Sequence, residues 1–274
     1  ILYAPAGLRG AEICLAFPSV GATENLLIAA AGTPAETKIT GAAAEPEISD
    51  LLAYLRGCGA LIESQPDGAI LVQGREALTG CCCHAILPDR IEAATYLAAA
   101  AITGGEITVY ARPEHLAAPL AALRRMGCRI TTGEQSITLT APEHLQGAGS
   151  IVTLPYPGFP TDLQAIFMAL AAAAEGYTAF TETVFPRRWA HVEELRRLGA
   201  DITVVGSHAV IRGAPLIGSA LTCTDLRAGA AVVLAALAAK GESSVTAISH
   251  IERGYADFVP TLRHLGADIC LTEV

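Results

Sequence analysis

The segment LPYPGFPTDLQ, residues 154–164, places a carboxylate directly after a stiff loop. Three prolines and Gly158 precede Asp162, and helix-forming residues follow it. Proline restricts the backbone and glycine permits a close approach, so the loop would fix the position of the Asp162 side chain. A fixed carboxylate at the mouth of a cleft suits a general base or an acceptor for a sugar hydroxyl. A helix start with no further role is the alternative.

The residues around Asp162 also predict how the helix begins. Thr161 and Gln164 fit a capping box, with Thr161 as the N-cap. Asp162 would then be the first residue of a buried helix. The helix dipole favours a carboxylate there and lowers its pKa.

The basic residues of the chain are nearly all arginines. Of 18 basic residues only Lys38 and Lys240 are lysines. The arginine guanidinium binds planar carboxylates and phosphates with two hydrogen bonds. The formal net charge of -9 argues against nucleic acid or an anionic membrane surface as the main partner.

Eight scattered cysteines favour reduced thiols over a disulfide framework, and we expect a cytoplasmic protein. Cys81, Cys82 and Cys83 precede His84, a grouping that suggests a metal site. Adjacent residues on a strand point to opposite faces and cannot easily share a tetrahedral zinc ion, so we predict buried or interdomain thiols and no metal. The apolar stretch 228–239 has about half of the ~20 residues needed to span a bilayer.

Four segments of the chain end alike, which indicates an internal repeat. They are LRGCGALI (55–62), LRRMGCRI (123–130), LRRLGADI (195–202) and LRHLGADI (262–269). Their glycines, Gly59, Gly127, Gly199 and Gly266, recur at intervals of 68, 72 and 67 residues. Each glycine stands where the left-handed residue after a helix belongs.

Each repeat predicts the same series of elements. An alanine-rich helix (near 22–32, 90–103, 162–175 and 225–240) precedes a short strand, an amphipathic helix and a hairpin. In the last repeat the hairpin is reduced to one strand, DICLTEV.

The alanine-rich helices predict the architecture. The stretch AAVVLAALAA (230–239) is apolar on every side and must be buried all round. We therefore predict an α/β fold, an inside-out α/β barrel with these helices inside and the sheets outside. Residues 1–86 would be the last unit of an incomplete first domain, and residues 87–274 a second domain of three units.

Several strings resemble the UDP-N-acetylglucosamine enolpyruvyl transferase family of 1-carboxyvinyltransferases. They are PYPGFPTDLQAIF, TETVFPRRWAHVEELRRLGA, TDLRAGAAVVLAALAAKG, HIERGYADFVPTLRHLGADI, LPDRIEAATYLAAAAITGG and FPSVGATENLLIAAA. The similarity runs in order along nearly the whole chain, and the family's two domains have three units each with helices inside.

The resemblance implies transfer of the enolpyruvyl group from phosphoenolpyruvate to the 3-hydroxyl of UDP-N-acetylglucosamine, with release of phosphate. This is a step of peptidoglycan synthesis and so serves cell shape and division. It implies no metal or organic cofactor, and small-molecule substrates as partners.

By the same resemblance, Asp162 would bind the sugar 3-hydroxyl and act as its base. The nucleotide sugar would also contact Ser19, Val20, Gly21 and Val184. A plain turn into a helix is the alternative for residues 19–21.

The resemblance also implies residues that bind phosphoenolpyruvate and phosphate: Arg253, Arg227, Arg188 and Asp225. Arg227 and Arg90 fall in the first turns of predicted helices, where we expect free N–H groups to assist anion binding. The alternatives are a surface ion pair for Arg253, a solvated basic spot for Arg188 and a helix cap for Asp225. For the lone histidines His191 and His250 we expect structural hydrogen bonds.

The chain departs from the family pattern in three places. A Lys-Asn pair and a loop carrying a reactive cysteine are absent. The chain opens with Ile, and we expect these features in a missing segment before residue 1. Pro18 stands where a basic residue is usual, and Pro186 and Arg187 also differ. We therefore expect poor turnover from the 274 residues alone. A shikimate-pathway enolpyruvyl transferase and a catalytically silent nucleotide-sugar binding protein remain the alternative functions.

Overall fold

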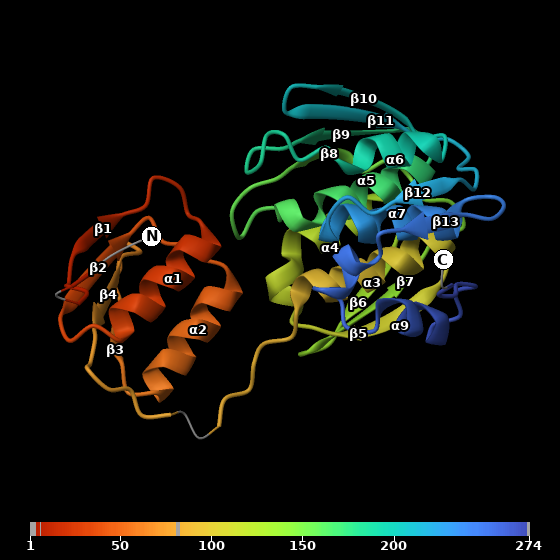
Figure 1. Ribbon diagram of the computed structural model, residues 1–274. Coiled ribbons are helices and arrows are strands. Elements are labelled where there is room, and N and C mark those ends of the chain that lie inside the picture. Colours follow the sequence, from red (N-terminus) through yellow and green to blue (C-terminus); the bar gives the residue numbers. More distant parts are fainter. Residues whose placement is uncertain (1–3, 6, 81–82, 273–274) are drawn as a thin grey trace. The chain divides into compact units, whose positions relative to one another are not determined.

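The computed structural model describes residues 4–5, 7–80 and 83–272 (Figure 1). The chain divides into two compact units. Unit 1 comprises Ile1–Leu87 with Pro155–Pro157, and unit 2 comprises Pro88–Leu154 with Gly158–Val274. Cys81 and Cys82 of the predicted thiol group lie outside the described residues.

Unit 1 contains one copy of the repeat. Its elements are β1 (Glu12–Cys14), α1 (Val20–Ala31), β2 (Glu36–Thr40), α2 (Pro46–Gly57), β3 (Leu61–Ser64) and β4 (Ile70–Gln73). The strands form one sheet in the order β1-β2-β4-β3, in which β1 is parallel to β2 and the other pairs are antiparallel. The core of unit 1 includes Leu27 and Ala31 of α1 and Ile39 and Val72 of the sheet, all without solvent exposure.

Unit 2 contains three copies. The first has α3 (Arg90–Thr103), β5 (Glu106–Tyr110), η1 (Pro113–Leu116), α4 (Ala117–Arg125), β6 (Arg129–Thr132) and β7 (Ser136–Thr140). The second has β8 (Gly149–Val152), η2 (Thr161–Leu163), α5 (Gln164–Ala173), β9 (Tyr177–Thr181), α6 (His191–Arg197), β10 (Asp201–Val205) and β11 (His208–Arg212). The third has β12 (Ala220–Thr222), α7 (Leu226–Ala238), β13 (Ser244–Thr246), α8 (Ser249–Glu252) and α9 (Phe258–His264).

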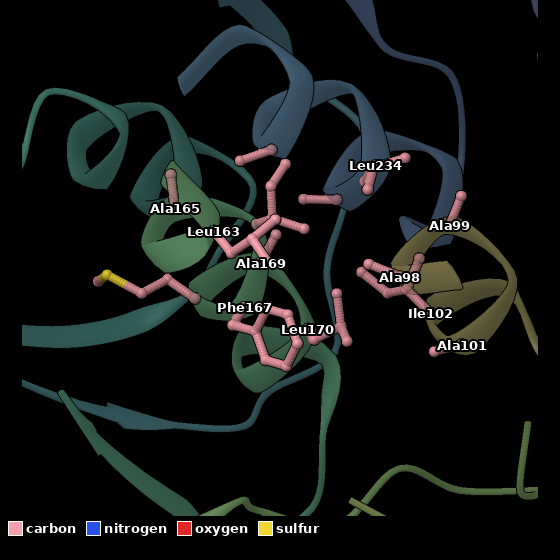
Figure 2. Close-up of a cluster of buried hydrophobic side chains, with 14 of the residues drawn as sticks. Ala98, Ala99, Ala101, Ile102, Leu163, Ala165, Phe167, Ala169, Leu170 and Leu234 are labelled. Atoms are coloured by element: carbon pink, nitrogen blue, oxygen red, sulfur yellow. The ribbon is translucent and has the colours of Figure 1, made fainter. Parts of the chain in front are cut away.

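The alanine-rich helices α3, α5 and α7 pack against one another in the middle of unit 2. Leu97, Leu170 and Leu234, one from each helix, have no solvent exposure. Figure 2 shows the side chains of the three helices meeting in this cluster, among them Phe167 and Leu170 of α5 and Leu234 of α7. The sheets and the second helices surround them, so the predicted inside-out order is confirmed for unit 2.

The repeated glycines behave as predicted. Gly59, Gly127, Gly199 and Gly266 have φ angles of +97°, +94°, +96° and +102°, each just beyond the end of the second helix of its repeat. A residue with a Cβ is strained in this region, so glycine lets the chain reverse into the segment that follows.

Three of the repeats contain one strand more than the sequence predicted. β1, β8 and β12 precede the alanine-rich helix and pair in parallel with the strand that follows it, β2, β9 and β13. Each alanine-rich helix α1, α5 and α7 is therefore the crossover of a βαβ unit, which brings its N-terminal end near the end of the preceding strand. These strands have only three or four residues, too few for a clear alternation.

The strand predicted for DICLTEV is wrong over its described part. Residues 268–272 pair with no strand among the described residues. The other three repeats supply a hairpin partner, β4, β7 or β11, and a strand without a neighbour to share its hydrogen bonds is not stable.

None of the helices in the described ranges is long and apolar enough to cross a membrane.

Candidate active site

Two of the three inner helices of unit 2 begin with a capping aspartate. Asp89 Oδ1 accepts hydrogen bonds from the N–H groups of Ile91 (2.8 Å) and Glu92 (3.0 Å). Asp225 Oδ1 accepts from the N–H groups of Arg227 (2.9 Å) and Ala228 (2.8 Å). The N–H groups that we expected to be free at these helix starts are therefore already satisfied by the chain.

Asp162 also lies near the start of an inner helix, α5, and behaves differently. The helical backbone starts earlier here, with the 3₁₀ turn η2, whose N-cap is Pro160. The predicted capping box is wrong, because the Thr161 hydroxyl donates to Glu182 Oε2 (2.9 Å) and the Gln164 side chain is fully buried. Asp162 thus lies within the first turn, and its carboxylate leaves its own helix uncapped.

The carboxylate of Asp162 lies between two guanidinium groups. Arg188 Nη1 donates to Asp162 Oδ1 at 2.8 Å, and Arg227 Nη2 donates to Asp162 Oδ2 at 3.3 Å. Burial would raise the pKa of Asp162, but Arg227 and Arg188 outweigh it and hold this pKa below its ordinary value. The predicted direction is confirmed, although the cause is the two arginines. The side chain remains 39% exposed, so a ligand can reach it.

Tyr255 holds Arg227 in place, and Thr95 in turn holds Tyr255. Arg227 Nη1 donates to the Tyr255 hydroxyl at 3.1 Å, and the guanidinium also lies over the Tyr255 ring, 5.4 Å from the centroid. The same hydroxyl bonds the Thr95 hydroxyl of α3 at 2.9 Å. Burial raises the pKa of Tyr255, so this phenol stays neutral at pH 7 and can accept from Arg227. Residues from all three repeats of unit 2 therefore build one cluster around Asp162.

The loop before Asp162 is closed on itself. Leu154 N–H donates to Phe159 O at 2.9 Å, and the Tyr156–Pro157 bond is cis. Phe159 is buried edge-on against Phe167 of α5, with ring centroids 4.9 Å apart. These contacts fix where the chain enters η2, which is the role predicted for the proline-rich segment.

Val184 and Arg188 lie on the loop that follows β9. Val184 N–H donates to Glu182 Oε1 at 2.8 Å. Arg188 Nη1 also donates to the Thr161 hydroxyl at 3.2 Å, and its guanidinium lies 5.5 Å from the exposed Phe185 ring. Arg188 is therefore a fixed member of the Asp162 cluster and not a solvated basic spot.

Arg253 is exposed at the end of α8. Across the described parts of the chain it makes no hydrogen bond or ion pair, so its guanidinium is available to an anion. The arginines that pair with Asp162 are Arg188 and Arg227.

In unit 1, Ser19, Val20 and Gly21 form the start of α1. Ser19 is the N-cap, and its hydroxyl oxygen accepts from Ala22 N–H at 3.3 Å. Gly21 is exposed, with open space where a Cβ would stand. These residues therefore form the turn into a helix that was the alternative for them, and their contact with a nucleotide sugar stays a prediction.

Within the described ranges, no histidine or cysteine is hydrogen-bonded to Asp162, Arg188 or Arg227. His191 is buried with Nε2 3.0 Å from Met168 Sδ, and burial lowers its pKa to about 4. His250 is exposed and, over the described residues, has no side-chain hydrogen bond, so the structural bond expected for it is wrong. The cysteines within the described ranges are free thiols, and no group of three metal-binding side chains occurs there.

Sequence reasoning missed Thr95, Tyr255 and Glu182. The signals were present, because Tyr255 closes the string HIERGY and Glu182 lies in TETVF. Their partners come from other repeats or other segments, and those pairings appear only once the chain is folded.

Comparison with known proteins identifies the family. The model of the family described as EPSP synthase (3-phosphoshikimate 1-carboxyvinyltransferase) matches residues 2–262. The UDP-N-acetylglucosamine 1-carboxyvinyltransferase 1 of Symbiobacterium thermophilum is 49% identical over 267 residues, covering 97% of this chain and 60% of the relative. The corresponding enzyme of Gluconacetobacter diazotrophicus is 47% identical over 268 residues, with 97% and 63% covered. The chain thus spans about three fifths of the length of these relatives.

Solved structures agree on the fold. The enolpyruvyl transferase NikO from Streptomyces tendae matches with a TM-score of 0.85 at 28% identity, covering 95% of this chain and 65% of that one. EPSP synthase from Acinetobacter baumannii matches with a TM-score of 0.72 at 19% identity, covering 97% and 64%, which shows the shared fold alone. The inside-out α/β architecture, the named relatives and the family match over residues 2–262 together show that this chain belongs to the EPSP synthase family of enolpyruvyl transferases.

Proposed function

We propose that the protein transfers the enolpyruvyl group of phosphoenolpyruvate to the 3-hydroxyl of UDP-N-acetylglucosamine in peptidoglycan synthesis, releasing phosphate. One observation carries the proposal: an accessible, ionised carboxylate, Asp162, is held between Arg188 and Arg227 and is not used as a helix cap. The names of the relatives at 47–49% identity support the amino-sugar substrate.

Asp162 acts as the base in this proposal. The sugar 3-hydroxyl donates a hydrogen bond to its carboxylate and transfers its proton there as the oxygen bonds to the central carbon of phosphoenolpyruvate. The carbon–carbon double bond breaks in the same addition, because the methylene carbon takes up a solvent proton. Loss of a proton from that carbon then restores the double bond and expels phosphate. A carboxylate held by two cations is a weak base. Anionic substrate groups that bind Arg188 and Arg227 neutralise those cations, and the pKa of Asp162 then rises toward a value at which it accepts the proton.

The arginines bind the phosphate and carboxylate of phosphoenolpyruvate. Arg188 and Arg227 are fixed by Thr161 and Tyr255, so they are preorganised for the charge that develops during addition. Arg253, exposed and unpaired within the described residues, adds a third cation. Asp225 serves this site by capping α7, which fixes the backbone of Arg227.

The nucleotide sugar binds through Ser19, Val20, Gly21 and Val184. The start of α1 offers backbone N–H groups that suit a diphosphate.

We also propose that unit 1 is one of three repeats of a first domain. Its helix α1 corresponds to the inner helices of unit 2, yet Ile28 of α1 is 57% exposed. In unit 2 the alanine-rich helices pack against one another, and most of their residues are buried. We also place the enzyme in the cytoplasm.

Titration calorimetry on the 274-residue chain tests the substrate. Binding is the measured quantity because the chain spans about three fifths of its relatives' length. We expect saturable binding of UDP-N-acetylglucosamine and at least about tenfold weaker binding of shikimate 3-phosphate, a difference of ~1.4 kcal/mol. Binding of shikimate 3-phosphate with none of the amino sugar would reverse the choice of substrate.

Phosphate release in the full protein that the gene encodes tests catalysis. Release that requires both phosphoenolpyruvate and UDP-N-acetylglucosamine is expected. Binding of the amino sugar without any release would support a silent binding protein and contradict the transferase.

A further inference from the structure

Glu182 is a fully buried carboxylate with an unusual set of partners. Its Oε1 accepts from the Thr153 hydroxyl (2.8 Å) and from the N–H groups of Val184 (2.8 Å) and Phe185 (2.9 Å). Its Oε2 accepts from the Thr161 hydroxyl at 2.9 Å. Among the described residues no cation pairs with it. Four hydrogen-bond donors offset the cost of burying its charge.

These four bonds join three segments of the second repeat in unit 2. Thr153 follows β8, Val184 and Phe185 belong to the loop after β9, and Thr161 begins η2. Thr161 also accepts from Arg188 Nη1, which in turn donates to Asp162. A continuous hydrogen-bonded chain therefore runs from the buried Glu182 to the Asp162 carboxylate.

The other repeats show what happens when this glutamate is missing. The residue that follows the corresponding strand is Gly41 after β2, Ala111 after β5 and Ala247 after β13. Neither glycine nor alanine has a side-chain oxygen that could accept a hydrogen bond from a hydroxyl group. In those repeats the first helix is capped, by Ser19, Asp89 and Asp225 respectively.

We propose that Glu182 is a positioning residue that keeps Asp162 free for chemistry. The bond from Thr161 to Glu182 fixes Thr161 as the first residue of the turn η2, so the helical backbone begins before α5 itself. An N-cap residue lies outside the helix and folds its side chain over the N–H groups of the first turn, whereas Asp162 lies within the turn and its carboxylate reaches Arg188 and Arg227. The consequence for catalysis rests on the proposed function, whereas the geometric effect does not.

Three variants separate this role from simple support of the fold. Thr161→Val keeps the side-chain shape and removes both the donor to Glu182 and the acceptor for Arg188. Thr161→Ser restores the hydroxyl. Glu182→Gln can keep the three bonds at Oε1, while an amide nitrogen replaces the acceptor of Thr161. Thr108→Val is the matched control, because it removes a hydroxyl bond to Thr138 on an exposed sheet of the same unit.

Crystal structures of the variants give the first measurement. In Thr161→Val and Glu182→Gln we expect Asp162 to accept from the backbone N–H of Gln164 or Ala165, as Asp225 does from its own helix. The amide resonances of Gln164 and Ala165 report the same change in solution. Asp162 still paired with both arginines in either variant would overturn the proposal.

Calorimetry with UDP-N-acetylglucosamine gives the second measurement. We expect Thr161→Val and Glu182→Gln to weaken binding about tenfold, and Thr161→Ser and Thr108→Val to stay within about twofold of the unsubstituted chain. Equal losses in Thr161→Ser and Thr161→Val would overturn the role of the hydroxyl. If the unsubstituted chain binds no amino sugar, the proposed function fails, and the crystal structures still decide the role of Glu182.

Discussion

Asp89 and Asp225 accept hydrogen bonds from the backbone of the helix that follows them, whereas Asp162, the aspartate at the inner helix of the middle repeat of unit 2, faces Arg188 and Arg227. All three precede a buried alanine-rich helix. A capping oxygen is occupied by N–H donors and is a poor proton acceptor, so two of the three aspartates serve stability. The difference teaches that a carboxylate not used as a helix cap is left accessible and paired with arginines, which is the state that the proposed function requires.

Replacement of Asp162 is expected to have the largest effect on activity. A small effect would contradict the difference drawn between Asp162 and the two capping aspartates. Asp162→Asn removes the ionisable oxygen, and a general base typically accelerates a reaction 10²–10⁴-fold, so phosphate release in the full protein should fall at least about 100-fold. Asp89→Asn keeps a good cap and is the control, with activity within about threefold. Similar losses in both variants would mean that the two carboxylates do the same work.

Acid titration sharpens the comparison, because a buried group of the same repeat, His191, titrates at a higher pH than Asp162. His191 has a pKa near 4 when folded and an ordinary value of 6.5 when unfolded. Below pH 6.5 the unfolded chain binds the proton and the folded chain does not, so the unfolding free energy falls as pH drops to about 4. The loss is at most about 3 kcal/mol.

Urea unfolding of the protein and of His191→Gln between pH 7 and pH 4 measures this loss. The variant should be nearly flat over that range, while the unsubstituted protein declines. Asp162, whose pKa is lowered, contributes its loss only at lower pH. Parallel curves for the two proteins would contradict a neutral buried histidine.

Removing a capping oxygen should have a moderate effect. Asp89→Ala leaves the N–H groups of Ile91 and Glu92 unpaired at the start of α3, and loss of a cap costs about 1 kcal/mol. Denaturant unfolding of Asp89→Ala and Asp89→Asn checks this, with the asparagine variant expected to recover most of the loss. An alanine variant as stable as the parent would show that the cap contributes nothing.

The smallest effect is expected from a substitution on the surface of α1. It compares an exposed position in the middle of this alanine-rich helix with a buried position in α7. Ile28 is 57% exposed, so Ile28→Ser should change the unfolding free energy by less than about 0.5 kcal/mol. Leu234→Ser in α7, where the side chain has no exposure, is the matched core variant and should cost several kcal/mol. A large loss from Ile28→Ser would show that this face of α1 is covered in solution.

Much of the fold could be predicted because the same sequence pattern occurs in four copies along the chain. The glycines Gly59, Gly127, Gly199 and Gly266 mark each helix end, and the all-apolar stretch of α7 requires burial on every side. The short strands β1, β8 and β12 escaped prediction, since they are recognisable only by their parallel partners.

The site was predictable in its residue types but not in its pairings. Asp162, Arg188 and Arg227 stand out by composition and by resemblance. The capping box at Thr161 failed because a residue distant in sequence, Glu182, competes for the same hydroxyl. Local patterns assume that a side chain serves its nearest backbone, and a tertiary hydrogen bond overrides that assumption.

The Asp162 cluster contains Thr95 of α3, Arg188 of the middle repeat and Arg227 of α7, so its geometry depends on the alignment of the three repeats. A slide of one inner helix by a single residue's rise, about 1.5 Å, would carry the 3.3 Å contact between Arg227 and Asp162 outside hydrogen-bonding range. Close packing of the alanine side chains at the centre of unit 2 therefore stabilises the fold and also fixes the positions of α3, α5 and α7 relative to one another.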